Sequence, residues 1–272
     1  MKVKDYFLSK EEFNILPTTI PGVLKTDPVP KNLDKYYQST EYISHYQDKG
    51  SLKEKVYKFA QSFNLNYKRN ILNQYFFKYA NILDYGSGAG EFLKFIEEYY
   101  TTFGYEPNHN ARNASKGKLQ KTVLINNLKE LGDDSLDGIT LWHVLEHIEN
   151  KDEIIQEFYR ILKPSGKLIL ALPNYKSYDA KYYQKYWAAY DVPRHIFHYS
   201  KEGVANTFEK TKWSLLKIKP LHLDAIYISI MSEKYKKNLF FLLKGLLIGS
   251  ISNFKAVKSN EFSSLIYILE KK

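Results

Sequence analysis

Short apolar segments alternate with amphipathic segments from about residue 80 to residue 271. The apolar segments are rich in β-branched and aromatic residues and predict strands at 81–86, 102–107, 122–126, 137–143, 167–174, 214–221 and 263–271. The segments between them predict helices at 91–100, 108–117, 151–163 and 201–212. Strands that alternate with helices form a mainly parallel sheet covered on both faces, so the predicted fold class is α/β.

The first 50 residues lack this alternation. Prolines interrupt them at four positions, Pro17, Pro21, Pro28 and Pro30. They predict an irregular N-terminal extension with short helical pieces, whereas residues 51–77 have the apolar spacing of a helix. We therefore divide the chain into an extension or lid, residues 1–50, and a domain, residues 51–272. Within the domain, residues 175–200 form an aromatic lid segment and residues 234–258 a basic, apolar insertion.

Composition narrows the class of protein further. The 272 residues include no cysteine, which excludes disulfides and cysteine-bound metals, and the net charge is +10. That charge suits nucleic acid, an anionic membrane or an acidic ligand, but the lysines are scattered, so we expect no nucleic-acid partner. The N-terminus has no apolar core of a signal peptide, and the most apolar run, Leu239–Ile251, is too short to span a bilayer. The expected location is cytoplasmic.

A glycine-rich turn follows the first strand of the alternating region. Its sequence is Gly86-Ser87-Gly88-Ala89-Gly90, and glycine allows both a tight reversal and close approach of a ligand to the backbone. The helix behind the turn offers free N–H groups. A dinucleotide-binding turn would place a third glycine where Glu91 stands, which disfavours an NAD-linked oxidoreductase. Glu106, about 20 residues on, ends the second strand, where a carboxylate can accept both hydroxyls of a ribose.

The stretch "LWHVLEHIEN" contains the pattern His143-x-x-Glu146-His147 of an inverted zinc peptidase. Two zinc-binding histidines at that spacing would have to lie on one face of a helix. The preceding residues, "DGITLW", predict a strand that ends near His143, which is the wrong geometry for such a pair. No third ligand can be assigned. The sequence therefore predicts no metal ligand.

The chain resembles class I S-adenosylmethionine-dependent methyltransferases. The G-x-G-x-G turn with Asp84 before it is similar to motif I of that family. "LWHVLEHI", "ILKPSGKLILALPN" and "DVPRHIFHYS" resemble blocks of its small-molecule members, including the ubiquinone-biosynthesis O-methyltransferases. The resemblance covers about residues 51–272 and implies a Rossmann-like, doubly wound sheet of seven strands, the last antiparallel, with S-adenosylmethionine as cofactor.

The resemblance also implies roles for particular residues. The turn would hold the methionine part of the cofactor, Asp84 would brace the turn, and Glu106 would bind the ribose. The loop at Asn127–Leu128 and the strand end at His143 would flank the adenine and the sulfonium, and Tyr36 and Tyr37 would fold over the cofactor as a lid. The predicted cofactor-binding residues are Asp84, Gly86, Ser87, Gly88, Gly90, Glu106, Asn127, Leu128, His143 and Tyr37.

A hydroxyl or protonated amine acceptor needs a base of near-neutral pKa. His147 is the first candidate, and His195 with Arg194 is the second. The alternative is a structural cluster in which Glu146, His147, Arg194 and His198 are hydrogen-bonded and fix the lid.

The predicted function is methyl transfer to oxygen or nitrogen of a small molecule, with lipid-linked and carbohydrate acceptors both open. An RNA methyltransferase and a non-catalytic nucleotide-binding module remain alternatives. The segment Lys234–Lys255 could contact a membrane surface, form part of an acceptor pocket for a lipid-linked substrate, or pack as a helical cover on the sheet. The oligomeric state stays open.

Overall fold

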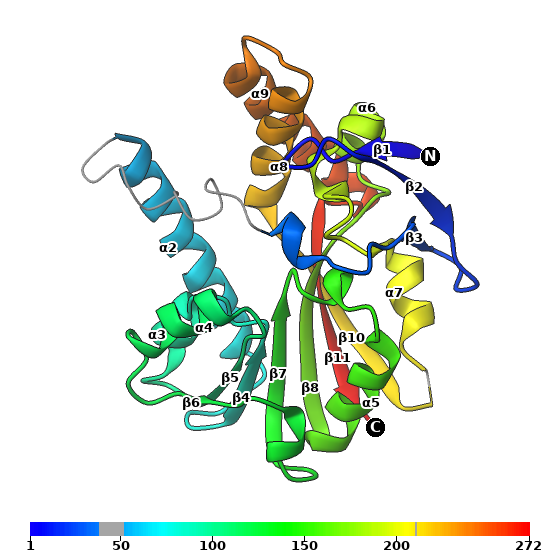
Figure 1. The fold of residues 1–272 in the computed structure, drawn as a ribbon. Helices are drawn as coiled ribbons and strands as arrows, with labels where there is room; N and C mark the ends of the chain where they lie inside the picture. The colour runs from blue at the N-terminus through cyan, green and yellow to red at the C-terminus, as the bar shows by residue number, and fades with distance from the viewer. Residues whose placement is uncertain (38–51, 210) are drawn as a thin grey trace.

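The computed structural model describes residues 1–37, 52–209 and 211–272 and places most of them around a seven-stranded sheet (Figure 1). The strand order is β10-β11-β8-β7-β4-β5-β6. Only β11 runs antiparallel to its neighbours β8 and β10, which confirms the predicted topology. The bounds are β4 (Asn81–Tyr85), β5 (Thr101–Tyr105), β6 (Val123–Leu124), β7 (Leu136–Trp142), β8 (Leu162–Pro173), β10 (Trp213–Pro220) and β11 (Ser264–Lys271).

Helices cover both faces of this sheet. The helices are α2 (Leu52–Leu72), α3 (Glu91–Ile96), α4 (His109–Lys116), α5 (Lys151–Ile161), α6 (Tyr178–Tyr183), α7 (Lys201–Thr207), α8 (His222–Tyr235) and α9 (Phe241–Ser259). Short 3₁₀ turns are η1 (Asp34–Tyr36), η2 (Leu128–Glu130), η3 (Leu145–His147), η4 (Gln184–Tyr186) and η5 (Ala188–Tyr190). Successive strand residues point to opposite faces, so Ile82 and Leu83 of β4 lie in two different apolar clusters. Both faces are therefore core, as a doubly wound fold requires.

The N-terminal residues form strands, so the prediction of an irregular segment with helical pieces was wrong for them. Strands β1 (Lys2–Lys4), β2 (Glu12–Pro17) and β3 (Val23–Asp27) pair with β9 (Phe197–Tyr199) in an antiparallel sheet. Phe13 and Ile15 alternate with exposed residues and point into a core, which is the period of a half-buried strand. Residues 38–50, the rest of the predicted extension, lie outside the described residues.

This small sheet lies at the carboxyl edge of the large one. Asn174, directly after β8, forms an isolated parallel bridge with Tyr199 of β9. In Figure 1 the N-terminal sheet and the α8–α9 hairpin both stand beyond the ends of β7 and β8. Ligands of doubly wound folds bind outside the carboxyl ends of the strands. The added elements therefore lie where a ligand site would be.

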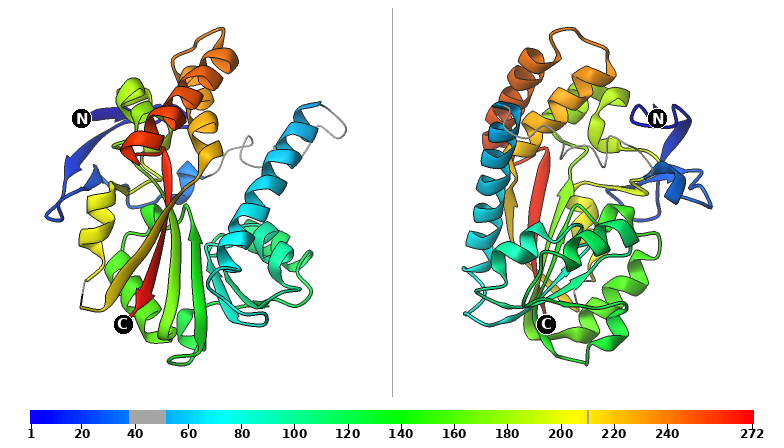
Figure 2. Two further views of the ribbon diagram at one scale, coloured as in Figure 1. Left: turned by 180° about the vertical axis from the view of Figure 1, so that it is seen from behind. Right: turned by 60° about the vertical axis from the view of Figure 1, so that its left-hand side comes forward.

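The segment 234–258 is helical, as predicted, but it packs differently. It forms the end of α8 and most of α9, and α9 packs mainly against α8 and α6 rather than on a face of the sheet (Figure 2). Two glycines allow the helices to approach closely. A Cβ at Gly245 would lie 2.5 Å from Ile230 Cα, and one at Gly249 would lie 2.6 Å from Ile226 Cα.

Candidate active site

The glycine turn joins β4 to α3 at the carboxyl edge of the sheet. Gly86 has a φ of 80°, and a Cβ there would lie 2.4 Å from the Val144 side chain, so only glycine fits. Gly88 has a φ of 54° and open space where its Cβ would be. Between them, the buried Ser87 hydroxyl has no hydrogen-bond partner among the described residues. A backbone cradle with an unsatisfied hydroxyl fits the amino-acid part of S-adenosylmethionine.

Glu106 lies against this turn from the end of the neighbouring strand. Its Oε2 accepts a hydrogen bond from the Gly88 N–H at 2.8 Å, and its Oε1 accepts one from the Asn108 N–H at 2.8 Å. Both N–H groups are neutral donors on the backbone, so the carboxylate is oriented without an ion pair. A carboxylate held beside the turn suits the ribose diol that the sequence predicts for it.

The Asp84 side chain is buried below the turn and is hydrogen-bonded to the neighbouring strand β7. The Thr140 hydroxyl donates to its Oδ1 at 2.6 Å. Burial raises the pKa of Asp84 to about 7, against the opposing effects of the Thr140 hydrogen bond and the positive charge of Lys68. Lys68 comes from α2 and lies over the Trp142 ring at 4.4 Å. Asp84 thus joins β4 to β7, which suits a residue that braces the turn.

Asn127 and Leu128 follow β6. The Asn127 side chain caps η2 by accepting from the Lys129 N–H, and Leu128 is buried. Together with Tyr85 and Tyr105, whose rings stack at 4.6 Å, they line a cavity of about 290 Å³. Their predicted place beside the adenine stays a prediction.

His143 follows β7 directly and has a left-handed backbone with a φ of 59°. Its Nε2 lies 2.9 Å from Asp224 Oδ2, and its Nδ1 lies 3.4 Å from Glu146 Oε1. Burial opposes the charge on this ring, but the contacts with Asp224 and Glu146 outweigh burial and raise the pKa of His143 to about 10. His143 is therefore an imidazolium at neutral pH, clamped between two carboxylates.

The H-x-x-E-H pattern is divided between two elements, as the sequence predicts. His143 lies after the strand, whereas Glu146 and His147 belong to the 3₁₀ turn η3. The two histidines therefore cannot act as neighbouring ligands on one α-helix. The peptidase interpretation is excluded by this backbone geometry.

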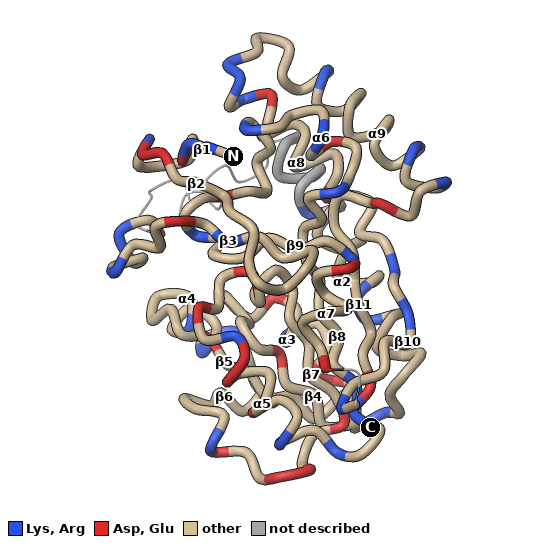
Figure 3. Tube along the Cα trace, turned by 90° about the vertical axis from the view of Figure 1, so that its right-hand side faces the viewer, with Lys and Arg blue, Asp and Glu red and all other residues tan. Residues whose placement is uncertain are grey.

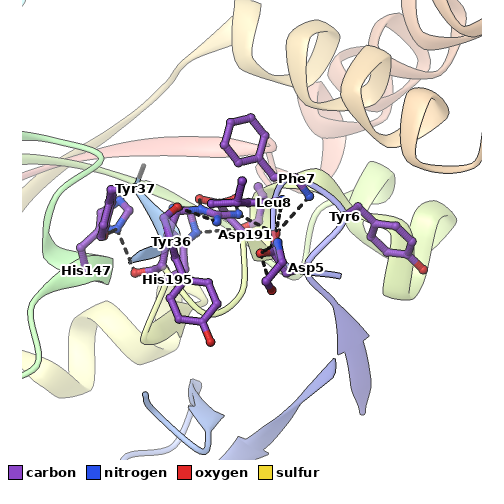
Figure 4. A network of polar contacts seen from close by, with 12 residues as sticks. Asp5, Tyr6, Phe7, Leu8, Tyr36, Tyr37, His147, Asp191 and His195 are labelled. Atoms are coloured by element: carbon purple, nitrogen blue, oxygen red, sulfur yellow. Dashed lines mark hydrogen bonds and ion pairs between the residues drawn. The ribbon is translucent and has the colours of Figure 1, made fainter. Parts of the chain in front are cut away.

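His147 faces the N-terminal segment and the turn before β9. Its Nδ1 lies 2.9 Å from the Arg194 carbonyl oxygen and 3.1 Å from the Tyr37 hydroxyl (Figure 4). The His195 ring packs edge-on against it at 4.6 Å. Burial, followed by the electrostatic effect of the neighbouring His195, lowers the pKa of His147 to about 4. His147 is therefore neutral at physiological pH but only weakly basic.

Arg194 is fully engaged with the N-terminal segment. Its guanidinium donates to Asp191 at 2.6 and 2.9 Å, to Asp5 at 3.0 Å and to the Tyr36 carbonyl at 3.1 Å. Burial opposes its charge, but Asp191 and Asp5 raise the pKa of Arg194 further above its usual value. Figure 4 shows Asp5, Asp191 and Tyr36 gathered around this contact. The guanidinium joins residues 189 positions apart, which is a structural role.

The predicted cluster of Glu146, His147, Arg194 and His198 is not one hydrogen-bonded network. His147 contacts the Arg194 carbonyl rather than its guanidinium, and His198 Nε2 contacts the Thr26 hydroxyl at 2.9 Å. These side chains instead fasten η3 and β9 to different parts of the N-terminal sheet. The structural interpretation stays a prediction; Arg194 and His198 have hydrogen-bond partners other than those predicted.

A cavity of about 410 Å³ lies between the N-terminal segment, the turn before β9 and α8. It is lined by aromatic and apolar side chains with a few polar groups, among them His143, Asp191, Arg194, His195, Asp224 and Tyr235. Such a concave, mainly apolar site with convergent polar groups is typical of small-molecule binding. His195 Nδ1 lies 2.9 Å from the Ala189 carbonyl, so that nitrogen carries the proton and Nε2 keeps a lone pair.

Glu146, His147 and His195 could also hold a cation. Each offers one ligand atom, and the three atoms lie within 4.8 Å of one another. Glu146 is 1% exposed, and neither carboxylate oxygen makes a hydrogen bond within the described part of the chain. Burial raises the pKa of Glu146, but the contact with His143 lowers it more, so that pKa lies below its usual value. His143 is thus the compensating charge in the protein as it stands.

Asp224, Lys68 and Asp5 were missed by the sequence reasoning. Asp224 opens α8 and reaches His143, Lys68 reaches toward Asp84 from α2, and Asp5 reaches Arg194 from the N-terminal turn. None lies in a block that resembles the family. A charged residue at the mostly apolar start of α8 was the one available signal for Asp224.

The sheet order, with the glycine turn at the carboxyl edge, defines a Rossmann-like, doubly wound fold. The family model described as "Methyltransferase domain" matches residues 46–218, so the chain belongs to that family. This confirms the predicted class, an S-adenosylmethionine-dependent methyltransferase with that compound as cofactor.

Named relatives agree with this class. The ubiquinone/menaquinone biosynthesis C-methyltransferase UbiE of Vibrio vulnificus strain YJ016 is 23% identical over 189 residues, which is 64% of this chain and 71% of that protein.

Solved structures share the fold. A phosphoethanolamine N-methyltransferase 2 of Haemonchus contortus in complex with S-adenosyl-L-methionine has a TM-score of 0.51 at 17% identity. The match covers 76% of this chain but only 52% of that one, so the chain spans about half of that protein's length. A SAM-dependent methyltransferase from Archaeoglobus fulgidus has a TM-score of 0.50 at 21% identity, with 80% of this chain and 99% of that one covered.

Proposed function

We propose that this protein transfers a methyl group from S-adenosylmethionine to an oxygen or nitrogen of a small molecule bound in the 410 Å³ cavity. One observation carries the proposal. Val144 packs against Gly86 of the turn, and its neighbour His143 lines the cavity. The predicted cofactor site and the cavity therefore meet at two adjacent residues, as transfer between two bound molecules requires.

The residues proposed to hold the cofactor are those of the turn, with Ser87 and Glu106 as side-chain contacts. Bound there, the cofactor supplies a methyl group on a positively charged sulfur, which needs no further activation. The protein then has to orient the acceptor, exclude water and receive its proton. The N-terminal segment and the turn at Asp191–His195 supply the enclosing walls.

We assign the proton acceptor to His195 rather than to His147. Both rings keep Nδ1 near a backbone carbonyl, which leaves Nε2 unprotonated. His195 lines the cavity, whereas the pKa of about 4 makes His147 a weak base. His143, with both nitrogens directed at carboxylates, is a positioning residue at the junction. Arg194 is proposed to hold the lid closed through Asp5, and Tyr37 to fix His147.

The first test is binding and turnover with the whole chain. Calorimetry should detect S-adenosylmethionine binding, and release of S-adenosylhomocysteine should be measured with a panel of phenols, catechols and amines. His195→Gln should lower turnover by about 100-fold or more, which is the usual contribution of a positioned base. Cofactor affinity should not change.

His109→Gln serves as the matched control, because His109 is exposed on α4 and does not line the cavity. Turnover by His195→Gln within twofold of the wild type would refute the base assignment. Cofactor binding without turnover on any acceptor would favour the non-catalytic module. Methyl incorporation into RNA would favour the nucleic-acid alternative. Transfer to carbon, as the name of the UbiE relative states for that protein, would correct the acceptor atom.

A cytoplasmic location stays a prediction. No helix in the described ranges combines the length and apolarity needed to cross a membrane.

A further inference from the structure

The α8–α9 hairpin, residues 222–259, has its large apolar side chains on the outside. On α9 the buried residues are Gly245, Ile248, Gly249, Ser252 and Ala256, which are mostly small. The exposed apolar residues of the hairpin are Tyr227, Leu239, Phe240, Leu242, Leu243, Leu246, Leu247, Phe254 and Val257. Leu239 and Phe240, in the turn between the helices, are 90% and 70% exposed. A surface helix of a soluble domain normally has the opposite arrangement.

These side chains form one stripe rather than scattered positions. Leu243, Leu247, Phe254 and Val257 follow helical spacing at i, i+4, i+11 and i+14, so they share the outer face of α9. Contiguous exposed apolar surface of this kind marks an interaction site. The glycine-mediated packing of the two helices leaves this face without a role in the hairpin's own stability.

The charges around the stripe have one sign. The hairpin carries six lysines, Lys234, Lys236, Lys237, Lys244, Lys255 and Lys258 (Figure 3). Its two acidic residues are turned inward: Glu233 is buried, with Lys244 Nζ 3.7 Å from its Oε1, and Asp224 pairs with His143. The other five lysines have no acidic partner within the hairpin. Apolar side chains bordered by lysines match a bilayer surface with anionic headgroups, which attracts each lysine and accepts the apolar face.

The hairpin also borders the acceptor cavity. Tyr227, Ile228, Met231 and Tyr235 of α8 line it, and Tyr227 is 60% exposed, so the hairpin supplies an exposed part of the cavity lining. We propose that the α8–α9 hairpin docks the protein on an anionic membrane and that the cavity takes its acceptor, a lipid-linked molecule with an apolar tail, from that membrane. The acceptor class rests on the proposed function, whereas the docking does not.

Docking is tested by co-sedimentation of the whole chain with phosphatidylcholine vesicles, with and without phosphatidylglycerol. The wild type should bind the vesicles that contain phosphatidylglycerol, and high salt should release most of it, because the attraction of lysines to anionic lipid is screened. The triple variant Leu243→Gln, Leu247→Gln, Phe254→Gln should bind at least about tenfold more weakly, since binding scales with buried apolar area. Phe77→Gln, which removes a 92% exposed ring outside the hairpin, should bind like the wild type.

Loss of sedimentation in the triple variant supports docking only if the fold is intact, which calorimetric cofactor binding and circular dichroism should show. The double variant Lys255→Gln, Lys258→Gln tests the charge independently, without altering the apolar stripe. Wild-type binding that is equal with neutral and anionic vesicles, or absent with both, overturns the proposal. So does a wild-type dimer that the triple variant dissociates, because the stripe would then be a contact between two copies.

Turnover with a water-soluble and with a vesicle-borne acceptor distinguishes the membrane proposal from the proposed methyl transfer. With a water-soluble acceptor, the triple variant should keep wild-type turnover, because none of its three positions lines the cavity. With a long-chain phenol carried in vesicles, its turnover should fall together with vesicle binding. Equal turnover of the vesicle-borne phenol by the triple variant and the wild type would overturn the membrane route while leaving methyl transfer intact.

Discussion

Two regions of the molecule differ in how far apart in sequence their hydrogen-bonded residues lie. They are the cofactor edge, which holds the glycine turn and Glu106, and the acceptor side, which surrounds the 410 Å³ cavity. Glu106 contacts Gly88 across 18 positions, and Asn127 caps the turn that follows it. On the acceptor side, Arg194 contacts Asp5 across 189 positions, and His198 contacts Thr26 across 172. The first region is built from β4, its turn, the adjacent strands β5 and β7 and the loops that follow β6 and β7. The second is assembled from four distant segments, so its chemistry depends on the whole fold.

The largest effect is expected where the acceptor side is fastened. Arg194→Met leaves the buried Asp5 and the half-buried Asp191 without their cation, and breaking a buried pair typically costs about 3–5 kcal/mol. Urea unfolding should show that loss in the free energy of unfolding. Lys121→Met removes a pair with Glu98 whose side chains are both more than half exposed, so it should cost about 1 kcal/mol or less. Equal, small losses of unfolding free energy in the two variants would mean that Arg194 does not fasten the acceptor side.

At the cofactor edge, the corresponding change is Glu106→Gln. It keeps the size of the side chain and an acceptor for the Gly88 N–H but removes the negative charge that the ribose hydroxyls would meet. Hydrogen bonds to charged groups are worth about 1.5–3 kcal/mol, so cofactor affinity should fall by about 10- to 100-fold in calorimetry. Glu98→Gln, which changes an exposed carboxylate outside the turn, should bind normally. Normal affinity in Glu106→Gln would remove Glu106 from the cofactor site.

The sequence predicts the cofactor edge better than it predicts the acceptor side. The doubly wound sheet of seven strands with an antiparallel last strand is what the family resemblance implies, and it was predicted. The sequence also placed Glu106 at the end of the neighbouring strand, but its hydrogen bond to the turn was not predicted. The N-terminal strands were not, because prolines and turns hide a short period-two pattern such as that of Phe13 and Ile15. The pairing of His143 with Asp224 had no local signal either, since 81 positions (224 − 143) separate them.

A smaller effect should separate a base from a metal ligand at His195. If Nε2 of His195 takes the acceptor's proton, a chelator such as EDTA should leave turnover unchanged, because the reaction needs no metal. Zn²⁺, which imidazole and carboxylate ligands suit, should inhibit by occupying Glu146, His147 and His195. Mg²⁺, which prefers oxygen ligands and retains its waters, should not inhibit. Loss of turnover on chelation, restored by Zn²⁺, would show that the cluster is a metal centre instead.

The last comparison concerns pH and the buried carboxyl below the turn. The pKa of Asp84 is raised from 3.8 to about 7 by burial, so between these values the folded state keeps a proton that the unfolded state has lost. Stability due to this group is therefore complete below pH 3.8, declines as pH rises and is lost by about pH 7. Asp84→Asn keeps an acceptor for the Thr140 hydroxyl but cannot ionise. The melting temperature of Asp84→Asn minus that of the wild type should therefore increase from pH 4 to pH 8. A difference that stays constant over that range would mean that Asp84 is ionised throughout, with Lys68 as its compensating charge.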